Sequence, residues 1–169
     1  MEITCLIRKM RTSDVKELSQ GFINQGWSGR EEILARYFLE QECGEREVLV
    51  AEVESALVGY ITILPIAKHG PFAGMAPELS DFNVFEPFQN QGIGNLLLEE
   101  AEKRVKLISD KVTLGVGLHS GYGSAQRLYI KRGYIPDGTG VWYRNQPLEM
   151  NATIQNNDDL VLYLSKEFE

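Results

Sequence analysis

The residues best suited to chemistry stand where a strand-like segment ending at Phe85 runs through a short turn into a helical segment. Gly92 and Gly94 lie at the expected start of that helix, and neither carries a Cβ that would keep an anion away from the backbone. The first turn of a helix has N–H groups without partners, and the helix dipole adds partial positive charge there. The junction therefore predicts a binding site for a phosphate or diphosphate group.

The residues around the two glycines do not fit two common phosphate-binding motifs. A Walker loop ends in Gly-Lys-Ser/Thr, whereas Asn95 and Leu96 follow Gly94 here. A dinucleotide-binding fingerprint would place a small residue three positions after Gly94, where this chain has Leu97.

The spacing Gln89-x-x-Gly92-x-Gly94 resembles the acyl-CoA-binding motif of the GNAT superfamily of N-acetyltransferases, which opens the helix after the fourth strand. Further along, Ser124–Tyr134 is similar to the second signature of that family, Ala-x-x-Leu-Tyr-x-x-x-Gly-Phe/Tyr, and lies at the expected distance. The two motifs cover only the middle third of the chain. The resemblance therefore informs the cofactor more than the acceptor.

The resemblance implies acetyl-CoA as co-substrate and no metal. Its diphosphate would bind the motif and the first turn of the helix, which are Gln89, Asn90, Gln91, Gly92, Ile93, Gly94 and Asn95. Val84 and Phe85 would offer backbone groups to the pantetheine arm, and an N–H near Val84 would polarise the thioester carbonyl. Ser124 is the analogue of a residue that often lies near the cofactor, although the N-cap of a short helix is an equally complete role for it.

Acetyl transfer to an amine also needs proton transfer. Tyr129 occupies the motif position whose phenol protonates the departing thiolate in many relatives, while packing against the sheet is the alternative. Glu78 stands six residues before Val84, where the histone acetyltransferase branch holds its glutamate base. Asp81 is the rival base, and an odd spacing in a strand would turn these two carboxylates to opposite faces. An ordered water with no dedicated base is the third alternative.

Other residues near the motifs have two readings each. The family commonly has Asn where this chain has Tyr122, so we expect that loop to take a different path, with the ring near the pantetheine arm or the acceptor. His119 is either a proton relay or a structural hydrogen-bond donor. Trp27 and Trp142 are candidates for the acceptor pocket or for core packing.

Charge and cysteine content limit the partners. The 169 residues include 17 Lys and Arg against 24 Asp and Glu, a net charge of -7, which argues against nucleic-acid binding. Negative charge favours cationic partners such as amines, or only keeps the protein in solution. Cys5 and Cys43 are isolated, which indicates free thiols in a reducing compartment and neither a zinc nor a redox motif. With no signal peptide or membrane span expected, we predict a cytoplasmic location.

Hydrophobic periodicity predicts alternating strands and helices in a single N-acetyltransferase domain over residues 1–169. The expected strands are 3–8, 47–53, 58–64, 79–85, 111–118, 134–143 and 160–164. The expected helices start near Ser13, start near Glu31 and end near Gly44, span 92–109, and span 124–132. The fold class is α/β (α+β). The GNAT resemblance implies a central mixed, mostly antiparallel sheet of about seven strands with about four helices, and splayed fourth and fifth strands.

The leading hypothesis is an N-acetyltransferase that moves the acetyl group of acetyl-CoA to the primary amine of a small-molecule acceptor, by direct attack in a ternary complex. The alternative is a non-catalytic acyl-CoA-binding or sensing module on the same fold. A nucleotide- or phosphate-binding protein would leave the Ala-x-x-Leu-Tyr segment without a role. The acceptor is not identified, and the oligomeric state is open, with a homodimer suggested by the many relatives that dimerise through late strands.

Overall fold

The computed structural model describes residues 3–169. Its strands are β1 (Cys5–Lys9), β2 (Glu47–Val53), β3 (Ala56–Leu64), β4 (Glu78–Val84), β5 (Lys111–Gly117), β6 (Ile135–Tyr143), β7 (Gln146–Pro147) and β8 (Leu160–Glu167). Its helices are α1 (Asp14–Asn24), α2 (Glu31–Glu42), α3 (Ile93–Lys106) and α4 (Gly123–Lys131), with short 3₁₀ turns η1 (Glu86–Phe88) and η2 (Ser120–Tyr122). The strands follow the order β1-β2-β3-β4-β5-β8-β6-β7, and this mixed sheet confirms the expected fold class.

The described residues form two compact units. The first contains the chain up to Leu64 together with Ser80–Arg104, and the second contains Pro65–Leu79 and Val105–Glu169. Strand β4 and helix α3 therefore each begin in one unit and end in the other.

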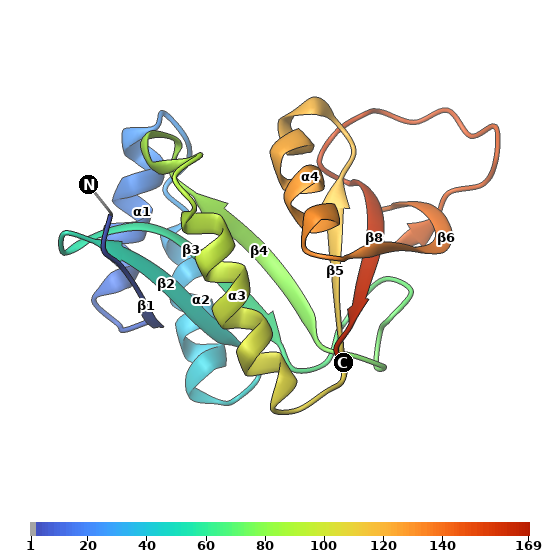
Figure 1. The fold of residues 1–169 in the computed structure, drawn as a ribbon. Coiled ribbons are helices and arrows are strands. Elements are labelled where there is room, and N and C mark those ends of the chain that lie inside the picture. The colour runs from blue at the N-terminus through green and yellow to red at the C-terminus, as the bar shows by residue number, and fades with distance from the viewer. Residues whose placement is uncertain (1–2) are drawn as a thin grey trace. The chain divides into compact units, whose positions relative to one another are not determined.

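In the first unit, β1, β2 and β3 pair antiparallel, with α1 and α2 on one face and α3 on the other (Figure 1). A two-residue loop joins β2 to β3, because Val53 pairs with Ala56. Its two residues, Glu54 and Ser55, have φ of 50° and 67°, the positive values that a tight hairpin turn needs.

Apolar side chains of α1, α2 and the strands close the core of the first unit. Leu18 and Phe22 of α1, Leu34 of α2 and Tyr60 of β3 belong to one buried cluster and are at most 1% exposed. The spacing of four residues between Leu18 and Phe22 puts both on one face of α1, as the sequence predicts.

In the second unit, the start of β4 runs parallel to β5, with Glu78 opposite Thr113 and Leu79 opposite Leu114. These two pairs cover the part of β4 that belongs to this unit. Strand β5 then pairs antiparallel with β8, and β8 with β6. The register of β6 and β8 shifts between Pro136 and Val141, where the residues Pro136-Asp137-Gly138 predict a turn.

Several local predictions were wrong. The helical spacing predicts one apolar face over 92–109 with Leu96, Leu97, Ala101, Val105 and Ile108. Leu96 is instead 39% exposed, and Ile108, which lies beyond the end of α3, is 61% exposed, while Glu102, expected on the solvated face, is 4% exposed. The buried face of α3 contains Leu97, Leu98, Ala101 and Val105, so it is centred about one residue away from the predicted stripe. Strand β7 was not expected, and β8 extends beyond the predicted 160–164 because its polar C-terminal residues still pair with β5.

Two helix starts also differ from prediction. Helix α4 begins at Gly123 with Tyr122 at the N-cap, so Ser124 lies inside the first turn and is not the cap. For α2, the sequence offers Ser28 or Gly29 as the residue before Glu31, but the N-cap is Arg30, whose φ of 62° is left-handed. Neither N-cap residue forms a side-chain hydrogen bond to its helix.

Candidate active site

The end of β4 is anchored in the core of the first unit. Phe85 is 5% exposed, and its ring lies edge-on to Phe22 with centroids 5.1 Å apart. Its backbone N–H donates to the carbonyl of Val58 at 2.8 Å. The side chain and the N–H of Phe85 are therefore occupied, and Val84, which is half-buried, is the residue of this pair better placed to offer an N–H group.

The loop from η1 to α3 has the backbone geometry of an anion site. Asn90 and Gly92 have φ of 60° and 85°, on either side of Gln91. Alternating handedness turns successive N–H groups toward one side, as in the nests that bind phosphate. A Cβ added at Gly92 would meet no atom within 4 Å, and Asn90, Gln91, Gly92 and Asn95 are all exposed. The loop is tied back to β4 by the Gln89 amide, which donates to the Val84 carbonyl at 2.9 Å.

The first turn of α3 also differs in charge from the first turns of α1 and α2. Helix α1 begins with Asp14 and Glu17, and α2 begins with Glu31 and Glu32, whereas the first turn of α3 contains no acidic residue. A carboxylate there would stabilise the helix but would repel a bound anion. Its absence leaves the partial positive charge of this helix end available to a ligand.

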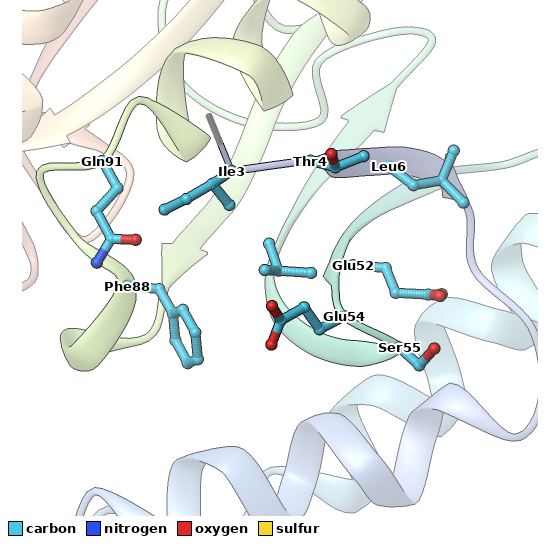
Figure 2. A pocket seen from close by; sticks show the side chains of 9 residues that line it. Ile3, Thr4, Leu6, Glu52, Glu54, Ser55, Phe88 and Gln91 are labelled. Carbon is cyan, nitrogen blue, oxygen red and sulfur yellow. The ribbon is translucent and has the colours of Figure 1, made fainter. Parts of the chain in front are cut away.

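A cavity of about 630 Å³ opens beside this loop. Figure 2 shows Phe88 and Gln91 on one side of it and Glu52 and Glu54 on the other. The remaining lining comes from Ile3, Thr4, Leu6, Val53 and Ser55. Of the predicted site residues, only Gln91 lines this cavity.

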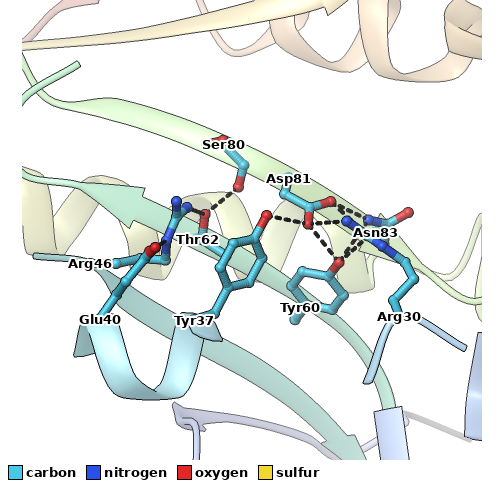
Figure 3. Close-up of polar contacts among 9 residues, drawn as sticks. All are labelled: Arg30, Tyr37, Glu40, Arg46, Tyr60, Thr62, Ser80, Asp81 and Asn83. Carbon is cyan, nitrogen blue, oxygen red and sulfur yellow. Dashed lines mark hydrogen bonds and ion pairs between the residues drawn. The ribbon is translucent and has the colours of Figure 1, made fainter. Parts of the chain in front are cut away.

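Asp81 is held by four side chains and is not a free base. Arg30 forms a bidentate ion pair with its carboxylate, at 2.7 and 3.1 Å, and the Tyr37 and Tyr60 hydroxyls each donate to it at 2.9 Å (Figure 3). Asn83 donates at 2.8 Å. This carboxylate therefore has no lone pair to spare for a proton from an acceptor amine.

The backbone at Asp81 also invalidates the prediction that Glu78 and Asp81 point to opposite faces of the strand because they are an odd number of residues apart. Its φ of 49° is left-handed, in the middle of β4. Side chains alternate between faces only where the strand is extended, so the predicted opposition of the two carboxylates does not follow across this residue.

Glu78 lies at the start of β4 in the second unit and is half-buried. Burial, together with the nearby charge of Glu78, raises the pKa of the Tyr163 phenol. The Tyr163 ring in turn fills the space beside Gly70, where a Cβ would be 2.5 Å from the ring. The charge of Glu78 therefore acts on the phenol of Tyr163, which stays protonated.

Tyr129 is 7% exposed in α4, and its ring lies 5.8 Å from that of Tyr134. Burial raises the pKa of its phenol, and Tyr122 adds to the effect. Tyr129 is therefore a proton donor over the whole neutral range. Ser124 is exposed, lies five residues before Tyr129 on the same helix, and does not serve as the helix cap.

Tyr122 and His119 form a small cluster with Asp158. His119 Nε2 lies 2.7 Å from the Asp158 carboxylate, and its Nδ1 accepts the N–H of Gly121 at 3.0 Å. This places the proton on Nε2 and occupies both nitrogens, so the structural reading of His119 fits and the relay does not. The Tyr122 hydroxyl donates to Asp158 at 3.2 Å, and its ring covers Gly117. Asp158 was missed, because only folding brings its polar loop to the end of β5.

The family is decided by comparison with family models. Residues 44–136, more than half of the chain, match the model of the acetyltransferase (GNAT) domain. The chain belongs to the GNAT family of acetyltransferases. A search of the curated proteins found no match.

Solved structures share this GNAT fold over nearly their whole length. PaiA N-acetyltransferase from Thermoplasma acidophilum, in complex with coenzyme A, is 19% identical with a TM-score of 0.68, covering 98% of this chain and 100% of that one. Ribosomal-protein-alanine N-acetyltransferase from Brucella melitensis is 23% identical with a TM-score of 0.69, covering 96% and 99%. The ribosomal L7/L12 α-N-protein acetyltransferase RimL, in complex with coenzyme A, is 13% identical with a TM-score of 0.72, covering 98% and 94%. At these identities the likeness shows the fold.

Other side chains of the GNAT chain have packing roles that the sequence left open. The Trp142 ring lies edge-on to Tyr163 at 5.6 Å, and its Nε1 donates to Thr139 at 2.8 Å. Trp27 stays 55% exposed and touches Phe22 with one side. Over residues 3–169, no three His, Cys, Asp or Glu side chains gather as metal ligands would, and none of the helices described is long and apolar enough to cross a membrane.

Proposed function

We propose that this GNAT chain transfers the acetyl group of acetyl-CoA to the primary amine of a small-molecule acceptor, by direct attack in a ternary complex. The observation that carries the proposal is the exposed η1–α3 loop, with left-handed Asn90 and Gly92 and a first turn free of carboxylates. Its support from outside the chain is that PaiA and RimL, which share the fold, hold coenzyme A in their crystals.

The diphosphate would be held by the residues of this loop and of the first turn of α3, from Gln89 to Asn95. The N–H groups of these residues can donate hydrogen bonds to the diphosphate, and the helix dipole adds partial positive charge at the same place. The pantetheine arm would follow the end of β4, where Val84 offers the backbone group that polarises the thioester carbonyl.

The chemistry then needs one proton removed and one proton delivered. The neutral amine nitrogen attacks the carbonyl carbon, the C–S bond breaks, and the electron pair leaves with sulfur. Tyr129, protonated because it is buried, would deliver a proton to the thiolate. Glu78, or water beside it, would take the extra proton of the amine. Asp81 has no place in this scheme, since its carboxylate is saturated.

A second candidate is an acyl-CoA-binding or sensing module without turnover. The observation that favours it is that one of the two candidate bases, Asp81, is fully engaged in ion pairs and hydrogen bonds. Such a module would bind acetyl-CoA through the same loop but would release no free CoA in the presence of any amine.

The cellular setting that we infer is the cytoplasm. Cys43 is an exposed free thiol and Cys5 is half-buried and free, which suits a reducing compartment. The acidic surface, at a net charge of -7, favours amines over nucleic acids as partners.

Binding and turnover are tested in two steps. Acetyl-CoA at about a hundred times its Kd should add roughly 2.7 kcal/mol to the free energy of unfolding and raise Tm, whereas NADH should not. A panel of polyamines, amino acids, aminoglycosides and peptide N-termini, screened for free CoA, then identifies the acceptor. No binding of millimolar acetyl-CoA in calorimetry would overturn the proposal, and binding without CoA release on any amine would favour the sensing module.

A further inference from the structure

Two residues of the first unit have left-handed backbone conformations and are paired with each other. Arg30 has φ of 62° directly before α2, and Asp81 has φ of 49° within β4. Arginine gains nothing locally from this conformation, and aspartate only tolerates it. Their side chains meet in a bidentate ion pair, which is one-quarter exposed or less on both sides. The tertiary contact therefore offsets the local strain at both positions.

Further side chains donate hydrogen bonds to the Asp81 carboxylate and to the Tyr60 hydroxyl beside it. We define the β4 clamp as Arg30, Tyr37, Tyr60 and Asn83 around the Asp81 carboxylate. Tyr60 Oη accepts from Arg30 at 2.5 Å and from Asn83 at 3.3 Å while it donates to Asp81. Burial and the charge of Asp81 raise the pKa of Tyr37 to about 12. The clamp therefore keeps its donors at any working pH.

The residue before Asp81 is held by a separate chain of contacts on the same side of β4 (Figure 3). The Thr62 hydroxyl donates to the Ser80 carbonyl at 2.7 Å and accepts from Arg46 at 2.7 Å. Arg46 is itself fixed by Glu40 at 2.6 Å and lies 4.1 Å over the Tyr37 ring. Two consecutive residues of β4 are thus tied to side chains of α2 and of the strands beside it.

Beyond the bend, the path of β4 is fixed by close packing on β3. A Cβ added at Gly59 would be 2.5 Å from the Asn83 carbonyl oxygen and 3.1 Å from the Val84 Cα. The strand therefore approaches β3 more closely here than any other residue at position 59 permits. A change in direction at Asp81 would be passed directly to Asn83 and Val84.

We infer that Arg30 is a positioning residue for the acyl end of the cofactor: through the clamp it sets the left-handed bend at Asp81, and with it the direction of the Val84 backbone. This inference rests on the proposed function, in which Val84 faces the pantetheine arm. The nucleotide half of the cofactor depends on a different segment, the η1–α3 loop. A change in the clamp should therefore affect binding of the pantetheine arm without affecting binding of the nucleotide.

The test compares two probes on the full chain. One is acetyl-CoA, and the other is adenosine 3′-phosphate 5′-diphosphate, the nucleotide half without the pantetheine arm. Arg30→Met should weaken acetyl-CoA binding by about tenfold or more and leave the Kd of the nucleotide within about twofold. Tyr60→Phe, which removes one hydroxyl, should show the same pattern more weakly and serves if Arg30→Met does not fold. Arg30→Lys should recover part of the loss, since it keeps the charge without the bidentate fork.

The matched control is Arg8→Met. Arg8 also forms a largely buried bidentate pair, with Asp14 at 2.7 and 3.0 Å, and a further ion pair with Glu52 at 3.0 Å, but it has no hydrogen bond or ion pair to β4 among the contacts described. Arg8→Met should lower Tm about as much as Arg30→Met does, while the Kd values of acetyl-CoA and of the nucleotide stay unchanged. Equal effects of Arg30→Met on the two probes, or none on either, would overturn the clamp inference and leave the proposed function standing. A wild type that binds neither probe would overturn both.

Discussion

Burial decides which of the candidate groups can exchange protons. Tyr129 is nearly inaccessible in α4, and burial raises the pKa of its phenol. Raising the pKa of an acid makes it a weaker acid but keeps it protonated. A free thiol has a pKa of about 8.5, so a thiolate in water is too weak a base to take this proton. A thiolate released into the same buried surroundings would be a stronger base, because burial raises the pKa of a thiol as well.

Tyr129→Phe removes only the hydroxyl, so we expect turnover to fall by about 10²-fold with little change in the Kd of acetyl-CoA. Because the folded pKa is raised, ionisation of Tyr129 should cause no loss of wild-type rate between pH 6 and 9. Rates of CoA release at saturating acetyl-CoA measure both effects. Tyr134→Phe, which removes a hydroxyl from the neighbouring buried ring, is the control. Equal turnover in wild type and Tyr129→Phe would assign the phenol to packing and the proton to water.

The start of α3 is the element on which cofactor binding depends in the proposed function. Gly92 is the obvious position for a substitution, but its φ of 85° means that a branched side chain would strain the backbone as well as obstruct the ligand. A change that leaves the backbone alone and alters only the charge separates the two effects.

Asn95→Asp makes this change with nearly the same shape. A carboxylate in the first turn should keep or raise the free energy of unfolding, by about 0.3–1 kcal/mol, because it complements the helix dipole. The same charge should weaken acetyl-CoA binding, since it would face the diphosphate that we propose to bind here. Calorimetry and chemical denaturation on one preparation give both numbers. The control is Asn24→Asp, which adds the same charge at the C-terminal end of α1, far from the η1–α3 loop in the sequence. An acetyl-CoA Kd that Asn95→Asp does not change would move the diphosphate away from α3.

The whole molecule consists of two compact units that share a strand and a helix. Because β4 and α3 each pass from one unit into the other, neither unit can unfold completely while the other keeps both elements intact. This continuity favours one cooperative transition, as expected for a single domain.

Each unit contains one tryptophan, Trp27 in the first and Trp142 in the second. Fluorescence of Trp142→Phe and of Trp27→Phe therefore follows each unit separately during unfolding in urea. We expect the two fluorescence midpoints to occur at the same urea concentration, and the loss of helical circular dichroism to occur there too. Circular dichroism of the two variants against wild type controls for the substitutions themselves. Two separated midpoints would show that the chain has two domains.

The sequence by itself was sufficient for the elements and for the family. Strand β2 was predicted at its observed bounds, and most other strands and helices to within two or three residues, because local periodicity and glycine positions depend on neighbours in the chain. The two motifs led to the GNAT family, which the match over residues 44–136 confirms. The proposed diphosphate-binding loop could also be recognised from the sequence, since its N–H groups belong to consecutive residues.

Only the tertiary structure decided which polar side chains are free. Asp81 was a candidate base until Arg30, which lies 51 residues earlier, was found on its carboxylate. His119 was a candidate relay until Asp158, 39 residues later, was found beside it. A side chain's proton affinity depends on what lies within a few ångströms of it, and those neighbours come from distant parts of the chain. Sequence spacing therefore fixed where the chemistry could occur, and packing decided which groups remain able to perform it.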